Sequence, residues 1–131
     1  MTEKENIQFL VNARLLQASN AFNAGQLLRQ RSFYPDAINR FYYSMFYAVL
    51  ALLITKQLGT SKHQGAIALF EREFIKPGDF PKEMSAWLRK AFKYRLEADY
   101  ADSPEATEAR AVEIEAHAGD FIRVVKNYLQ P

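Results

Sequence analysis

The sequence predicts an all-α protein, an antiparallel up-and-down helical bundle of four long helices plus one short helix. Five segments carry apolar residues at the three-and-four spacing of a helix with one buried side. Pro35, Gly59, Pro77 and Pro104 fall between these segments. Residues 41–54 form a nearly continuous apolar and aromatic run in which Ser44 is the only small polar residue. A helix apolar on most sides must be covered by others, so we expect this run at the centre of the bundle.

Residues 3 to about 30 are expected to form the first long helix. Pro35 separates it from the central helix, because proline cannot continue a helix but fits the first turn of the next one. Gly25 is expected to allow a neighbouring helix to approach closely. It belongs to the apolar stripe of this helix, which consists of Ile7, Val11, Leu15, Ala18, Phe22 and Gly25.

The central helix is expected to end at the Leu58–Gly59 pair and has two different sides. The core side holds Phe41, Met45, Ala48, Val49 and Leu52. The other side is polar and aromatic, with its members within about 60° of one another on a helical wheel: Asp36, Arg40, Tyr43 and Tyr47. The apolar run spans 14 residues, fewer than the roughly 20 that cross a bilayer, so we expect no membrane span.

A third, short helix is expected to open with a capping box at Ser61 to Gln64. One side of it holds His63, Ile67, Phe70 and Phe74. His63 thus lies in the first turn, where the helix dipole disfavours the imidazolium form. It is interpreted either as a neutral histidine that bonds to a neighbouring helix or as a site residue at the end of the bundle.

The fourth helix is expected from Pro81 to about Tyr100, after a turn at residues 76–79. Arg95 lies near the middle of its apolar sector, and Asp99 follows one turn later. An unpaired arginine there would cost on the order of several kcal/mol of desolvation. Arg95 must therefore have a buried partner, with Asp99 the nearest candidate, or face a cleft or subunit interface; structural pairing and a functional site both remain open.

A last helix is expected after residues 102–105, whose sequence Asp-Ser-Pro-Glu is an N-cap signature. Its apolar side holds Ala111, Ile114, Ala118, Phe121, Val125 and Tyr128. No internal repeat or interdomain linker interrupts the pattern, so we expect a single domain over residues 1–131.

The composition excludes several classes of function. The chain has no cysteine and 2 histidines, which leaves little for a transition metal and excludes a thiol nucleophile. No phosphate loop, serine elbow or zinc helix is present, and we expect no metal and no cofactor. A net charge of +2 does not suit a general nucleic-acid binder, and the cations between Arg89 and Arg95 are interpreted as a solvated helix face. The first residues lack a secretory pattern, so the protein is expected to be cytoplasmic.

Three stretches together resemble a HEPN domain: RFYYSMFYA in the central helix, KHQGAIALFEREFIK at 62–76 and RLEADY at 95–100. More narrowly, the chain is similar to small HEPN proteins with a tyrosine-rich second helix and an Arg-x-x-Ala-Asp-Tyr signature, and the resemblance covers about residues 5–130. This resemblance implies an antiparallel helical bundle, frequent homodimers, and pairing with a minimal nucleotidyltransferase in a toxin-antitoxin-like system.

The resemblance also bears on catalysis. Active HEPN ribonucleases carry an arginine followed after four to six residues by a histidine, and Arg95 matches that arginine. Asp99 and Tyr100 stand where the histidine is expected, so the usual general acid or base is missing. Arg110 and His117 satisfy the bare spacing and are interpreted as a chance match.

The leading hypothesis is a dimeric HEPN interaction module that binds a nucleotidyltransferase partner, a nucleotide or RNA. Arg95 and Asp99 are the expected polar anchors of a cleft. A second contact surface is expected at Arg40, Tyr43 and Tyr47, since tyrosines suit interfaces and base stacking; bundle packing is the alternative role for these residues. The alternative function is a metal-independent HEPN ribonuclease toxin that uses Arg95 with Tyr100 or with His63.

Overall fold

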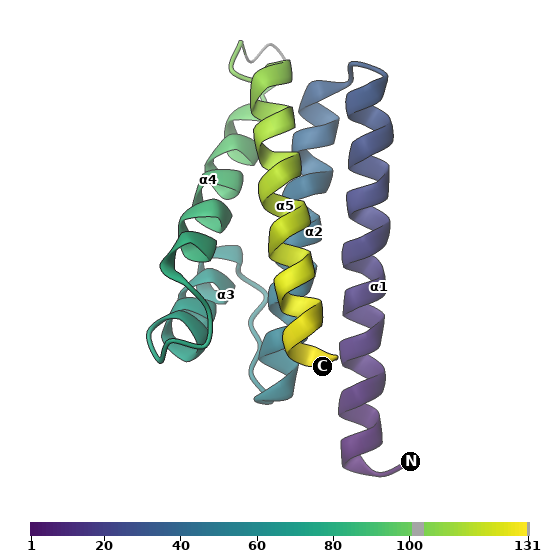
Figure 1. Ribbon diagram of the computed structural model, residues 1–131, viewed down its shortest axis with the longest axis vertical. Coiled ribbons are helices and arrows are strands. Elements are labelled where there is room, and N and C mark those ends of the chain that lie inside the picture. The colour runs from purple at the N-terminus through teal and green to yellow at the C-terminus, as the bar shows by residue number, and fades with distance from the viewer. Residues whose placement is uncertain (101–103, 131) are drawn as a thin grey trace.

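The chain folds into an all-helical bundle in the computed structural model, which describes residues 1–100 and 104–130 (Figure 1). Within these ranges it contains no β-strand. The all-α prediction is confirmed, with four long helices and a short third one that continues into a π-helical turn. The elements are α1 (Glu3–Gln30), α2 (Tyr34–Thr55), α3 (His63–Phe70), η1 (Glu71–Ile75), α4 (Lys82–Ala98) and α5 (Glu108–Leu129).

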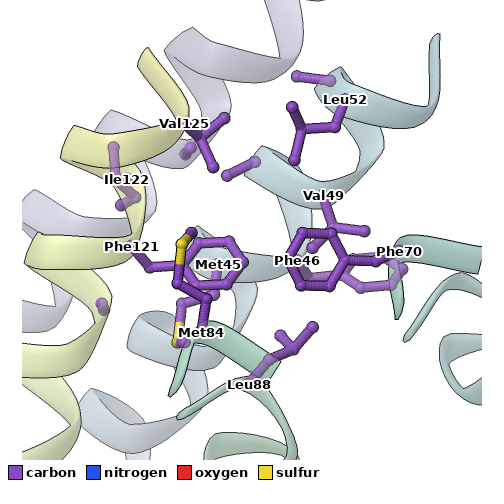
Figure 2. Close-up of a cluster of buried hydrophobic side chains, with 14 of the residues drawn as sticks. Met45, Phe46, Val49, Leu52, Phe70, Met84, Leu88, Phe121, Ile122 and Val125 are labelled. Atoms are coloured by element: carbon purple, nitrogen blue, oxygen red, sulfur yellow. The ribbon is translucent and has the colours of Figure 1, made fainter. Parts of the chain in front are cut away.

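Helix α2 lies at the centre of the bundle and contacts α1, α3, α4 and α5. Twelve of its 22 residues are buried, including all five expected on its core side. Figure 2 shows how Met45, Phe46, Val49 and Leu52 of α2 meet side chains from the other helices. The partners labelled there are Phe70, Met84, Leu88, Phe121, Ile122 and Val125.

By length and composition alone, α2 would be long and apolar enough to cross a membrane, with a mean hydropathy of 1.4 over an 18-residue window. The helix is longer than the apolar run that the sequence marks out. However, 67% of that window is buried inside the bundle. This burial is what the core helix of a small soluble domain shows.

Two expected helix ends differ from the structure. Helix α2 ends at Thr55, and the residue that takes the left-handed conformation is Gln57 (φ 55°), not Gly59. The capping box at Ser61 to Gln64 is also wrong, because Lys62 is the N-cap of α3 and makes no side-chain cap bond. Ser61 therefore stands one residue too early, and the Thr60 hydroxyl accepts from the Lys62 backbone N–H at 3.2 Å instead.

The start of the last helix also differs. Thr107 is the N-cap of α5, and its hydroxyl accepts from the Arg110 backbone N–H at 3.2 Å. The expected signature at residues 102–105 falls in part outside the described residues, and Pro104 and Glu105 lie in a turn before the helix. Tyr128 is 44% exposed although it was expected on the core side, and its hydroxyl donates to Asp79 at 3.1 Å.

From α3 to the start of α4 the structure agrees more closely with the prediction from the sequence. The apolar side of α3 and η1 buries Ile67, Phe70 and Phe74, as expected. The turn at residues 76–79 is present, and Gly78 takes a left-handed conformation at φ 92°. Glycine adopts this conformation without steric cost. Together these features place α4 against α2, with its last turn beside the first half of the central helix.

Gly25 allows α1 and α2 to pack closely, as expected. A Cβ atom built at this position would lie 2.6 Å from Cε1 of Phe41, whose ring is fully buried. Gly59 has no atom within 4 Å of the same built position. The two glycines therefore form a matched pair for testing this contact.

We expect Gly25→Ala to lower the free energy of unfolding by about 1–3 kcal/mol, because a methyl group overpacks the site. Urea unfolding followed by circular dichroism measures this change. Gly59→Ala is the control and should change stability by less than about 0.5 kcal/mol. Equal stabilities of the two variants would show that the α1–α2 contact has no steric limit at Gly25.

Candidate functional site

Arg95 projects from the last turn of α4 into a group of aromatic rings on α2 and α4. Its side chain is only 14% exposed. Its guanidinium carbon lies 5.2 Å from the ring centre of Tyr42, 5.6 Å from that of Tyr43 and 5.5 Å from that of Phe92. Cation–π attraction of this kind offsets part of the cost of removing the charge from water.

The polar contacts of Arg95 are incomplete. Its Nη1 donates to the Tyr43 hydroxyl at 3.2 Å. The Asp99 carboxylate is 4.0 Å from Nη1, at the outer limit of an ion pair, and its side chain is 50% exposed. The Nε atom is buried and has no hydrogen-bond partner among the described residues. Arg95 thus has a buried N–H donor without an acceptor in the described part of the chain. Most buried polar groups in native proteins are hydrogen-bonded, so this donor needs an explanation.

His63, the first residue of α3, lies against the same rings. Its Nδ1 is 2.7 Å from the Tyr42 hydroxyl, and its ring stacks on Phe46 with centroids 4.3 Å apart. Burial lowers the pKa of His63 below the usual 6.5, and the charge of Arg95 lowers it further. Burial also raises the pKa of the Tyr42 phenol, which stays protonated. When Tyr42 donates to Nδ1, neutral His63 carries its ring proton on Nε2.

Arg95 and His63 therefore share one aromatic box, which we define as Tyr42, Tyr43, Phe46 and Phe92. Both side chains contact Tyr42, Tyr43 and Phe92. Sequence reasoning places Tyr43 in a contact surface and misses Tyr42, Phe46 and Phe92. The sequence feature that could have pointed to these rings is Arg95, because an arginine in the apolar sector of a helix requires aromatic faces or an acid nearby.

The expected second contact surface joins the box through Tyr43. The Arg40 guanidinium carbon lies 5.2 Å from the Tyr43 ring centre, and the rings of Tyr43 and Tyr47 are 5.9 Å apart. Arg40 and Tyr47 also line a hollow of about 230 Å³ at the α1–α2 groove. All three side chains are partly exposed. They form a partly open aromatic and cationic surface that continues from the box.

Tyr100 lies apart from these residues. It follows the end of α4 and is 76% exposed. Its ring makes no contact with Arg95 or His63 among the described residues. Of the three candidate catalytic residues, the structure brings Arg95 and His63 together and leaves Tyr100 in solvent.

Arg110 and His117 have separate partners on α4. The Arg110 guanidinium pairs with Glu97 and lies 4.1 Å from the Tyr94 ring centre. The His117 ring stacks on Trp87 with centroids 5.1 Å apart. Each side chain is used in helix packing, which suits the interpretation of this motif match as chance.

Two cations on the outer face of α4 form ion pairs. Arg89 forms an ion pair with Glu71, and Lys90 forms one with Glu113 at 2.7 Å. This pairing reduces the positive field that the sequence suggests near residues 89–95. Within the described ranges no group of three or more His, Asp or Glu side chains could hold a metal ion.

Comparison with known proteins decides the family. The profile of the HEPN domain matches residues 11–128. The chain belongs to the HEPN domain family. This assignment confirms the resemblance seen in the central helix and in the RLEADY segment.

Several HEPN relatives cover almost the full chain. A protein of Methanocaldococcus jannaschii named as a candidate toxin, MJ0142, is 38% identical over 114 residues, 86% of this chain and 77% of that protein. A second protein so named, MJ0605 of the same organism, is 32% identical over 97% of this chain and 91% of its own length. The UPF0332 protein of Thermotoga maritima is 32% identical over 99% of this chain and 96% of its own length. The chain is thus similar to toxin-like members of the family.

We expect Arg95→Met to raise the pKa of His63, because it removes a positive charge beside the imidazole while burial still lowers the pKa. Titration of the His63 ring protons by NMR measures the shift. Arg110→Met removes a charge outside the box and serves as the control. A His63 pKa unchanged in Arg95→Met would contradict the proposed proximity of the two groups.

Proposed function

We propose that this chain is a single-domain, cytoplasmic HEPN module that acts as a dimer. It binds a minimal nucleotidyltransferase partner in a toxin-antitoxin-like system, and it binds RNA or a nucleotide at the aromatic box. The observation that carries the proposal is the buried Arg95 Nε without a hydrogen-bond partner, beside Tyr42 and Tyr43.

The chemistry of the box suits a nucleotide. A guanidinium binds phosphate through two parallel N–H bonds, and it stacks on planar groups. The partly exposed Tyr43 ring offers a flat surface on which a base stacks without regard to sequence, whereas Tyr42 is fully buried. A phosphate oxygen that bonded to Nε would satisfy the unused donor of Arg95 and would replace the weak contact with Asp99 at 4.0 Å. Because Nε is buried, a phosphate reaches it only when a neighbouring side chain moves.

The protein partner is assigned to the surface formed by Arg40, Tyr43 and Tyr47. Interfaces are enriched in tyrosine and arginine, because both bring contact area together with hydrogen-bond donors. The names of two relatives as candidate toxins support a role in a toxin-antitoxin pair. This surface continues into the box through the Tyr43 ring, so a partner bound there would lie beside the nucleotide.

We expect Arg95→Ala to weaken binding of a fluorescein-labelled, mixed-sequence single-stranded RNA 20-mer by about 10-fold or more, the loss of one charge-assisted contact. Fluorescence anisotropy at fixed ionic strength measures the dissociation constant. Arg89→Ala removes an exposed cation of the same helix that pairs with Glu71. It should weaken binding by less than about threefold.

Co-expression with the product of a neighbouring nucleotidyltransferase gene gives a second measure of the same proposal. The two proteins should co-purify, and Tyr47→Ala should reduce the yield of the complex. A parent protein that binds neither the 20-mer nor such a partner would refute the interaction module.

The second candidate is a metal-independent ribonuclease toxin. The structure favours it at one point, since His63 lies in the same box as Arg95 and its lowered pKa keeps it neutral at pH 7. The Tyr42 hydroxyl can accept as well as donate, so the tautomer with its proton on Nδ1 leaves Nε2 free to act as a base. Arg95 would then stabilise the negative charge that develops on the phosphate.

If the chain is a ribonuclease, the parent cleaves RNA in EDTA, and His63→Ala and Arg95→Ala each reduce the rate by about 100-fold or more. Denaturing gel electrophoresis of a labelled RNA measures the rate. Tyr100→Phe should leave it unchanged, because Tyr100 lies in solvent. Absence of cleavage by the parent, tested alone and free of any partner, would exclude the enzyme.

A further inference from the structure

The outer side of α1 exposes large apolar side chains to solvent. Phe9, Leu16 and Leu27 are 64%, 62% and 62% exposed. Figure 1 shows α1 at one edge of the molecule, with α2 and α5 on the same side of it. The buried residues Val11 and Ala18 occupy the opposite side of the helix. Helix α1 is therefore apolar on two sides, and the bundle covers one of them.

The exposed residues follow a coiled-coil spacing. Their positions advance in alternating steps of four and three residues, the spacing of a seam between two helices. All of them are exposed. We call this set the outer stripe: Phe9, Ala13, Leu16, Asn20, Asn23 and Leu27.

The part of the outer stripe from Leu16 to Leu27 lies in an uncharged stretch of α1. Between Leu15 and Leu28 no residue of α1 is charged, although 24% of the whole chain is. The exposed residues there are Leu16, Gln17, Asn20, Asn23 and Leu27. Solvent-facing sides of helices are normally charged, so a neutral side of this length is complementary to an equally neutral partner and not to a nucleic acid or a charged peptide.

The outer stripe is symmetric about the level of residue 18. Its members pair at equal distances from that level: Phe9 with Leu27, Ala13 with Asn23, and Leu16 with Asn20. Two antiparallel copies related by a twofold axis there would bring each residue against its counterpart. The apolar residues Phe9 and Leu27 would meet at both ends, and the asparagines near the middle would fix the register.

We propose that the outer stripe is the face on which a second copy of this chain docks, as an antiparallel α1–α1 pair. Hollows flank the stripe on both sides, and their linings also include the cations Arg40, Arg123 and Lys126. One, of about 430 Å³, lies between α1 and α5 and includes Asn23; the other, of about 230 Å³, includes Asn20. The proposal rests on the dimer of the proposed function and assigns its interface.

Sedimentation velocity of the parent chain and two variants tests the interface. The parent sediments as a dimer, and Leu16→Glu reduces the dimer affinity by 100-fold or more, because it places two carboxylates near the twofold axis. Val112→Glu is the control, since Val112 is 47% exposed on α5, and it should remain dimeric. Circular dichroism shows that each variant is folded.

The outcomes of these measurements distinguish the location of the interface from the existence of the dimer. A monomeric parent overturns both this proposal and the dimeric part of the proposed function. A dimer that survives Leu16→Glu, or one that Val112→Glu dissociates, overturns only the assignment of the face. The RNA measurement on Arg95 stands independently of either result, whereas Tyr47 lines the hollow that includes Asn20 of the outer stripe.

Disulfide cross-linking tests the direction of the pair, since the chain has no cysteine of its own. An equimolar mixture of Phe9→Cys and Leu27→Cys chains should form a covalent dimer under mild oxidation, whereas each variant alone should not. Within one α1 the two positions are about 27 Å apart, too far for an internal disulfide. Cross-linking of Phe9→Cys with itself, or none in the mixture, overturns the antiparallel arrangement.

Discussion

Burial of α2 on nearly all sides is the constraint on which the rest of this HEPN domain depends. Each large apolar side chain removed from water contributes on the order of 1.5–3 kcal/mol, and α2 is flanked by every other α-helix of the bundle. The central position of α2 also sets the site. Tyr42 and Tyr43 follow one another on this helix, so their rings point in different directions and meet both α3 and α4.

At the Arg95 site, the free-energy cost of burying a charged guanidinium is offset only in part by its contacts. Removing a guanidinium from water costs on the order of several kcal/mol, and each ring contact returns about 0.5–2 kcal/mol. Tyr43 and Asp99 satisfy one side of the group, and Nε remains without a partner among the described residues. A site that is nearly but not fully satisfied is well suited to a ligand that supplies the missing acceptor.

The fold follows from the sequence because apolar spacing and prolines mark the long helices, and their order leaves few ways to cover α2. Helix ends are less predictable, since the stop at Thr55 depends on Gln57 adopting a left-handed conformation that glycine would more often supply. The site is predictable in part. Arg95 stands out by its position, but its pairing with His63 requires α3 and α4 to meet on the same part of α2, which no local pattern encodes.

The hydrogen bond between Tyr42 and His63 links the aromatic box to the segment that connects α2 and α3. His63 is the first residue of α3, and residues 56–62 connect it to the end of α2. The connection is therefore anchored at its far end by the contact of His63 Nδ1 with the Tyr42 hydroxyl and by the contacts of the His63 ring with the aromatic box. A molecule that drew the imidazole away from the phenol would remove this polar contact at the start of α3, so occupancy of the box and the position of this connecting segment are physically linked.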